Sequence, residues 1–173
     1  MSIKTDSLTK MGLLLALIIV LGFIPAIPLG FVPVVLTVQN IGILLIGLVL
    51  TPLEAFLTTA SFLLLVAVGL PLLTGMRGGF AVFMGPTCGY LIGYLIASVV
   101  LAYLTKKPQT SWWLLFLKIA LAAVIIIDGL GMIGFAFNMH VSLIKAIELN
   151  AIFIPGDLIK SGIVAYFAQQ TKS

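Results

Sequence analysis

Apolar residues form long runs along this chain, and only short clusters of proline, glycine and charged residues interrupt them. A helix that crosses the hydrocarbon core of a bilayer needs about 20 mainly apolar residues. Proline and glycine end helices, so these clusters are the expected boundaries between spans. Six apolar runs are separated in this way, at residues 11–27, 34–50, 53–70, 85–104, 112–137 and 152–168. The pattern predicts an all-α, polytopic membrane protein in which six transmembrane helices form one bundle, a single domain over residues 1–173.

Two segments need separate consideration, the first apolar run and residues 80–84. The first run follows Lys4 and Lys10, as the apolar part of a signal peptide would, but no small-x-small cleavage pattern comes after it. We therefore expect it to be the first span. Between the third and fourth runs, residues 80–84 follow a glycine-rich connection and are expected to be extended or re-entrant.

Composition excludes a soluble domain. Of the 173 residues, 62% are apolar and only 8% are charged, and the mean hydropathy is +1.31, whereas a soluble surface must be largely polar. The net charge of +4 does not indicate nucleic-acid binding, because the basic residues are scattered at the ends of the apolar runs. The single cysteine, Cys88, excludes an internal disulfide and a thiolate metal site.

The distribution of basic residues predicts how the chain is oriented. Lys and Arg accumulate in the cytoplasmic connections of membrane proteins. With the N-terminus inside, the inner set is larger than the outer set, because it holds Lys4, Lys10, Lys106, Lys107 and Lys172 against Arg77 and Lys145. We therefore expect a multi-pass protein of the cell membrane, embedded in lipid, with both termini cytoplasmic.

The remaining polar residues fall on one side of the membrane in this topology. The outer half holds two amides, a guanidinium, two carboxylates and an ammonium, from Gln39, Asn40, Arg77, Asp128, Asp157 and Lys160. The convergence of such groups in one leaflet is what a pocket for a small polar solute requires. The sequence therefore predicts an outward-facing binding site.

Asp157 and Lys160 are the strongest candidates in this set, because they lie inside the last apolar run. An ionisable side chain at the centre of a span costs about 2.5 to 3.5 kcal/mol on insertion scales, so it is retained chiefly where it pairs or touches a ligand. Their separation of three residues places both on one helix face. They form either an ion pair that locks the last helix or contacts to different parts of a ligand, and the spacing alone leaves both open.

Small residues mark faces where helices approach closely. The glycines that follow Asp128 favour helix packing over ligand contact at that position. A ladder in the fourth run is also expected to pack internally, at Gly89, Gly93 and Ala97. A shorter ladder in the first run, Gly12 and Ala16, is suited either to internal packing or to contact with a partner protein.

Three motifs, taken in order and spacing, resemble the BioY family. They are PLGFVP followed by TVQN within residues 28–40, the stretch from GLP to GPTCGY within residues 69–90, and GDLIK at residues 156–160. BioY proteins are the biotin-binding substrate components, or S components, of energy-coupling factor (ECF) transporters. The resemblance covers nearly the whole chain and implies a six-helix S component with both ends cytoplasmic.

The resemblance also implies that the site binds biotin, which has a ureido ring, an apolar thiophane ring and chain, and a carboxylate. Asp157 would accept hydrogen bonds from the ureido N–H groups. One of the two amides, Gln39 or Asn40, would pair with the same ring. One of the two cations, Lys160 or Arg77, would hold the ligand carboxylate.

Further contacts follow from the same resemblance. Tyr90 and Phe80 are candidate apolar walls of the site. The loop over residues 30–37 and the loop that carries Gly79, residues 77–79, contain the glycines and prolines typical of lids. Biotin is expected as the transported ligand and not as a cofactor, and no cofactor is predicted.

The chain has no Walker motif or other phosphate cradle, so we expect no ATP hydrolysis and no enzymatic activity. The resemblance implies a transmembrane coupling (T) protein and two ATPase subunits as partners, with Gly12 and Ala16 as the docking face. Two alternatives stay open. One is an S component for another vitamin, such as thiamine or riboflavin. The other is an intramembrane enzyme that uses Asp157 and Asp128 as acid and base, although no nucleophile motif or metal set accompanies them.

Overall fold

The computed structural model describes residues 5–25, 27–28, 35–107 and 111–170 of the chain. The helices within them are α1 (Thr5–Gly22), α2 (Asn40–Val49), α3 (Pro52–Ala67), α4 (Cys88–Leu104), α5 (Trp112–Ala120), α6 (Gly129–Met139), α7 (Leu143–Asn150) and α8 (Phe153–Gln170). A 3-10 helix, η1 (Phe80–Phe83), precedes α4, and a π-helix, η2 (Leu121–Asp128), joins α5 to α6. Two short strands, β1 (Ile27–Pro28) and β2 (Val35–Leu36), pair antiparallel. The predicted all-α class is confirmed, with this small strand pair as an addition.

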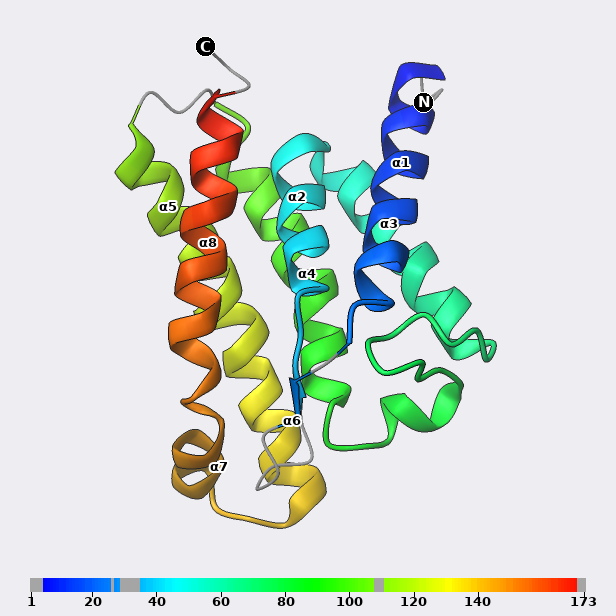
Figure 1. Ribbon diagram of the computed structural model, residues 1–173, viewed down its shortest axis with the longest axis vertical. Helices are drawn as coiled ribbons and strands as arrows, with labels where there is room; N and C mark the ends of the chain where they lie inside the picture. Colours follow the sequence, from blue (N-terminus) through cyan, green and yellow to red (C-terminus); the bar gives the residue numbers. More distant parts are fainter. Residues whose placement is uncertain (1–4, 26, 29–34, 108–110, 171–173) are drawn as a thin grey trace.

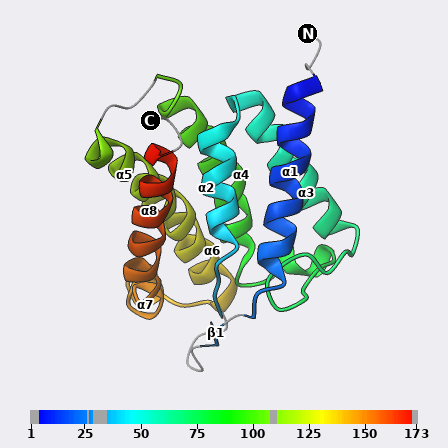
Figure 2. The ribbon, with the colours of Figure 1, turned by 45° about the horizontal axis from the view of Figure 1, so that its top comes forward.

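The helices form one bundle, with α2 and α4 between α1 and α3 on one side and α5 and α8 on the other (Figures 1 and 2). The central helix α4 contacts α2, α3, η2 and α6, and α8 packs on α5. The start of α1 and the end of α8 lie at the same end of the bundle, whereas α7 and the strand pair lie at the opposite end (Figure 1). This arrangement suits a chain whose two ends emerge on the same side of a membrane.

Glycines bring α4 into backbone contact with the long helix that α5, η2 and α6 form together. A Cβ atom on Gly93 would lie 2.9 Å from the Cα of Ile127, and one on Gly89 would overlap the carbonyl oxygen of Leu130. From the other helix, a Cβ on Gly134 would lie 2.7 Å from the Cα of Gly89. The predicted role of these small residues in close packing is confirmed, because a larger side chain would force the two helices apart.

The second apolar run is not helical throughout, which corrects the prediction of a helix over residues 34–50. β2 is extended, and α2 begins only at Asn40. The Gln39 N–H donates to the Thr37 hydroxyl, and the Thr37 carbonyl accepts from the ammonium of Lys160. Side chains thus make hydrogen bonds to these backbone groups, in place of the bonds that a first helical turn would provide.

The helix α7 is an element that the hydrophobic pattern does not predict. It is short, and its N-cap Ser142 accepts a hydrogen bond from the N–H of Lys145. The axes of α7 and α8 meet at 56°. Residues 80–84, predicted to be extended or re-entrant, contain the 3-10 helix η1 instead.

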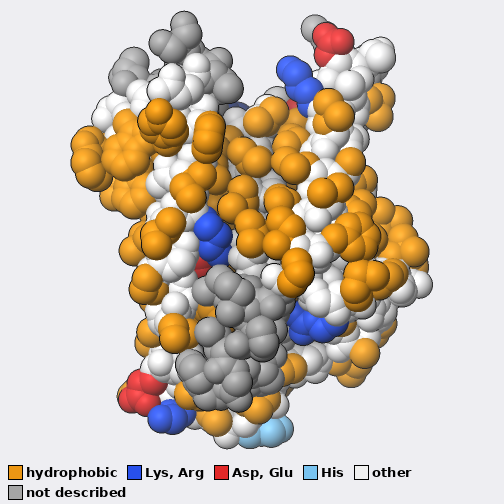
Figure 3. Space-filling model, viewed as in Figure 1, with side chains coloured by type: hydrophobic (Ala, Val, Ile, Leu, Met, Phe, Trp, Pro, Cys, Tyr) orange, Lys and Arg blue, Asp and Glu red, His pale blue; other side chains and the backbone are white. Residues whose placement is uncertain are grey.

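The outer surface is that of a membrane protein, because apolar side chains cover most of the visible face and few charged ones interrupt them (Figure 3). By length and hydropathy, the helices over Thr5–Gly22 and Trp112–Met139 are suited to span a membrane, and α7 with α8 would make a third span if the bent pair is one. The helices α2, α3 and α4 are apolar but have only 10–17 residues. Helix length among the described residues therefore does not establish the predicted count of six spans.

Candidate functional site

A cavity lies between the start of α2, the loop after α3, and the helices α4, η2 and α8. Six of the predicted substrate-binding residues line it together: Gln39, Asn40, Arg77, Tyr90, Asp157 and Lys160. The fold thus brings together residues that are far apart in the sequence.

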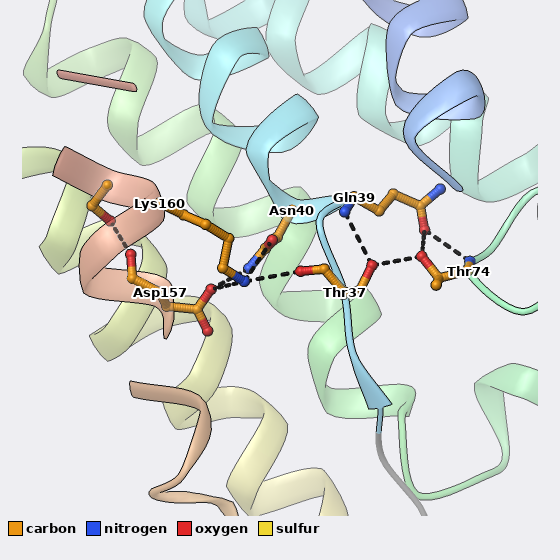
Figure 4. A network of polar contacts seen from close by, with 7 residues as sticks. Thr37, Gln39, Asn40, Thr74, Asp157 and Lys160 are labelled. Carbon is orange, nitrogen blue, oxygen red and sulfur yellow. Dashed lines mark hydrogen bonds and ion pairs between the residues drawn. The ribbon is translucent and has the colours of Figure 1, made fainter. Parts of the chain in front are cut away.

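A cluster of three polar side chains forms one side of the cavity, where α8 faces the start of α2 (Figure 4). The Asn40 amide donates from Nδ2 to Asp157 Oδ1 at 2.5 Å, and Lys160 Nζ lies 2.5 Å from the same oxygen. The side chains of Asp157 and Lys160 are only 5% and 12% exposed. The negative and positive charges therefore compensate each other in a region that water reaches poorly.

All three donors of the Lys160 ammonium have partners within the protein. Nζ donates to the Thr37 carbonyl oxygen at 2.9 Å and to Asn40 Oδ1 at 3.1 Å, and the third partner is Asp157. Since an ammonium has three N–H groups, these contacts account for its full capacity. Lys160 thus ties the residues before α2 to α8, and it is less suited than Arg77 to hold a ligand carboxylate.

Gln39 connects three segments of the backbone. Its Nε2 donates to the carbonyl oxygens of Ile18 at 3.0 Å and Leu72 at 2.7 Å, and its Oε1 accepts from the N–H and the hydroxyl of Thr74. The residue is 1% exposed. The Gln39 amide therefore connects α1 to the loop after α3. Asn40 is the amide that lies beside Asp157 (Figure 4).

Arg77 supplies a second cation, from the loop between α3 and η1. Backbone bonds between Leu73 and Arg77, at 3.0 and 3.2 Å, close a tight turn in which Gly75 and Met76 have positive φ angles. The Arg77 Nε donates to the Thr74 carbonyl oxygen at 3.3 Å, and no other hydrogen bond from its guanidinium is formed within the described residues. Because a guanidinium has five donors, most of its capacity stays available for an anionic group in the cavity.

Two tyrosines from α4, Tyr90 and Tyr94, give the cavity aromatic walls. The hydroxyl of Tyr90 donates to Asn150 Oδ1 at 3.2 Å, at the end of α7. Its ring lies over Gly131, where a Cβ atom would overlap it. The predicted wall residue Tyr90 therefore lines the cavity, whereas Phe80 is 68% exposed and does not belong to the lining.

Asp128, which the sequence places in the outer polar set although the glycines after it favour packing over ligand contact, also lines the cavity, at the end of η2. It is 2% exposed. Its Oδ2 has no hydrogen-bond partner among the described residues. Of the glycines that follow Asp128, Gly131 and Gly134 pack closely, as predicted. The carboxyl group of Asp128 itself belongs to a residue of the cavity lining.

Gly79 is not part of the lining that the described residues form. Its φ of +88° and its N–H bond to the Val66 carbonyl oxygen, at 2.8 Å, shape the loop that carries Arg77. The predicted lid over residues 30–37 lies largely outside the described residues, as does the motif at residues 28–33.

Gly12 and Ala16, predicted as a docking face, are exposed on the outside of α1. No atom lies within 4 Å of a Cβ atom built on Gly12. This ladder therefore does not pack against the described part of the chain, and of the two uses left open by the sequence, the contact with a partner is the one that the exposed position suits.

Several further lining residues were not predicted individually as ligand contacts. They are ordinary threonines and apolar residues whose neighbours are set only by the fold, namely Thr37, Leu73, Thr74, Thr87, Leu91, Tyr94, Ile127 and Phe153. Together with the charged groups they make a cavity that is polar and hydrogen-bonding near α8, aromatic along α4 and cationic at Arg77. Such a cavity is suited to a small ligand with a polar ring at one end and an anionic group at the other.

Comparison with known proteins gives consistent matches over the whole length. The profile of the BioY family matches residues 1–173. A biotin transporter BioY of Lactococcus lactis subsp. cremoris is 38% identical over 162 residues, which cover 91% of this chain and 86% of that protein. A probable biotin transporter BioY of Bacillus subtilis is 41% identical over 167 residues, which cover 96% of this chain and 90% of that protein.

A solved structure also matches closely. It is the crystal structure of the S-component for biotin from an ECF-type ABC transporter, with a TM-score of 0.93 and 34% sequence identity. The match covers 99% of this chain and 95% of that chain. At this TM-score and coverage, the two chains share the same fold.

Proposed function

The chain belongs to the BioY family, and we propose that it binds biotin and serves biotin uptake as the membrane-embedded S component of an ECF-type transporter. The observation that carries this proposal is the cavity in which Asn40, Asp157 and Lys160 form a compact polar cluster, while the guanidinium of Arg77 makes one hydrogen bond within the described residues. Its relatives are named as biotin transporters, and a structural neighbour at a TM-score of 0.93 is an S-component for biotin.

The chemistry of the cavity supports one orientation of the ligand. The ureido ring, with two N–H donors and a carbonyl acceptor, lies against Asn40 and Asp157. The apolar thiophane ring and chain lie along Tyr90 and Tyr94. The carboxylate reaches Arg77, because the ammonium of Lys160 already has three partners.

In the membrane, the chain crosses six times with both termini cytoplasmic. By sequence, Lys10 in α1 and Lys106 and Lys107 after α4 belong to the connections on the side assigned to the cytoplasm. The short α2 completes its crossing with the extended residues before it, which is tolerated where irregular backbone is buried in protein or lines a cavity. The cavity then opens toward the outside, from which biotin is captured.

Uptake against a gradient requires an energy source that this chain does not supply. We assign that role to a T protein and two ATPase subunits, and the origin of the structural neighbour, an S-component from an ECF-type ABC transporter, supports this assignment. Gly12 and Ala16 give α1 an exposed face on which another helix can approach closely. Biotin passes through as the transported ligand, and the chain acts as a transporter component and not as an enzyme.

A calorimetric titration of the detergent-purified protein tests the proposal. Biotin is expected to bind more tightly than micromolar, and biotin methyl ester at least tenfold more weakly, because the ester gives Arg77 no anion. Desthiobiotin, which keeps the ureido ring and the carboxylate, serves as the matched comparison. Tight binding of thiamine or riboflavin, with biotin weaker than micromolar, would establish an S component for another vitamin instead.

A further inference from the structure

Asp128 is a buried carboxyl group that the fold leaves without a full set of hydrogen bonds. It is 2% exposed and lines the cavity, and its Oδ2 has no partner among the described residues. Buried polar atoms in native proteins are almost always paired. An unpaired oxygen on a residue that lines a binding cavity therefore points to a ligand as its partner.

The backbone around Asp128 brings this carboxyl group into the cavity. It is the last residue of η2, and π-helical turns, which close i→i+5 bonds, occur often at functional sites. Gly93 of α4 lies against the backbone of Ile127. The end of η2 is therefore held beside the helix that carries Tyr90 and Tyr94.

The charged groups near Asp128 indicate which kind of ligand atom fits it. The carboxyl groups of Asp128 and Asp157 lie within hydrogen-bond distance of each other, and Lys160 lies within electrostatic reach. The three donors of Lys160 are already used. Two carboxyl groups that face one cavity repel each other when both are ionised, and an N–H donor placed against them is attracted by both. A ligand N–H group therefore fits this position better than a ligand anion.

We propose that Asp128 binds the ligand directly: its Oδ2 accepts a hydrogen bond from one of the two ring N–H groups of biotin, and Asp157 accepts from the other. This inference rests on the proposed function. A cyclic urea has one N–H group on each side of its carbonyl, so a single carboxyl group does not satisfy both well. Asp157 Oδ1 is moreover shared by Asn40 and Lys160, which limits what Asp157 alone can offer the ring.

Two biotin analogues, each methylated at one of the two ring nitrogens, test this on the wild-type protein. If each N–H group has its own carboxyl acceptor, both analogues bind at least tenfold more weakly than biotin. If only one methylation weakens binding, the assignment of a second acceptor is overturned. This arm of the test needs no variant and so does not depend on how a variant folds.

The variant Asp128→Ala identifies which nitrogen Asp128 serves. It is expected to weaken biotin binding at least tenfold. It is expected to leave unchanged the affinity for the analogue that is methylated at the nitrogen that Asp128 binds. Asp128→Asn, which keeps a neutral acceptor oxygen, is expected to lose less than Asp128→Ala. A loss of equal size for biotin and for both analogues would overturn the direct contact.

Thr58→Ala is the matched control. Thr58 also has a buried oxygen without a partner among the described residues, but it does not line the cavity, so biotin affinity is expected to stay unchanged. Failure of the wild-type protein to bind biotin would refute the proposed function. Normal wild-type binding with unchanged affinity in a folded Asp128→Ala variant would refute only the role of Asp128.

Discussion

Two lysines of this chain form ion pairs of the same spacing in very different surroundings, and their replacement by alanine is expected to have very different effects. Lys160 and Asp157 are 12% and 5% exposed, whereas Lys145 and Glu148, at a distance of 3.0 Å, are 57% and 58% exposed. Removing one partner of a buried pair costs about 3 to 5 kcal/mol of stability, because the other charge is left uncompensated. Removing one partner of an exposed pair costs about 0.2 to 1 kcal/mol.

Lys160→Ala is therefore expected to lower the unfolding midpoint of the detergent-purified protein well below that of Lys145→Ala. It also releases Asn40 and the Thr37 carbonyl, which both bond to the ammonium. Biotin affinity should fall at least tenfold, about 1.4 kcal/mol, and should stay unchanged in Lys145→Ala. The double variant with Asp157→Ala should be less destabilised than the sum of its single variants, because it leaves no isolated charge.

Unfolding curves measure the stability of these variants, and calorimetric titrations measure their affinity for biotin. Equal shifts in the unfolding midpoint for the two lysine variants would refute the reasoning from burial. Unchanged biotin affinity in a folded Lys160→Ala variant would refute the link between the ion pair and the ligand.

Three further predictions concern other parts of the molecule. Arg77→Ala should weaken biotin binding at least tenfold but leave the weaker binding of biotin methyl ester unchanged; calorimetry that shows equal losses for both ligands would contradict the assigned carboxylate contact. Gly89→Ala should abolish folding or lower the unfolding midpoint strongly, because the added Cβ atom would overlap the backbone of α6. Gly12→Ala should be tolerated, because no atom lies within 4 Å of its added Cβ atom. Equal unfolding midpoints for the two variants would contradict the close crossing of α4 and α6. Ala16→Phe should reduce copurification with the T protein and ATPases while biotin affinity stays normal, and Ser61→Phe, at an exposed position of α3, should change neither; an intact complex with Ala16→Phe would place the docking face elsewhere.

The charged part of the site could be predicted because ionisable residues are conspicuous in apolar runs. Asp157 and Lys160 stand out for this reason, and their spacing of three residues places them on one helix face, where the structure shows them as an ion pair. Asn40 and Arg77 were expected at the site because of their placement in the same leaflet and because of the family resemblance. Their actual contacts depend on the extended segment before α2 and on the turn in the loop after α3.

The role of Gln39 could not be predicted, because three of the four hydrogen bonds of its side chain go to backbone groups, of Ile18, Leu72 and Thr74. Any residue type offers such groups, so the sequence carries no mark of them. The cavity position of Asp128 depends on a π-helical segment, which hydrophobic periodicity does not reveal. The late start of α2 has the same kind of cause, since side chains far along the chain satisfy the backbone before it.

A crystal structure of this protein with biotin would test the central claim most directly. The account predicts that the ureido ring lies within hydrogen-bond distance of Asn40 and Asp157, with the ligand carboxylate at the guanidinium of Arg77. Biotin bound outside this cavity, or with its carboxylate against Asp157 and its ring at Arg77, would contradict it.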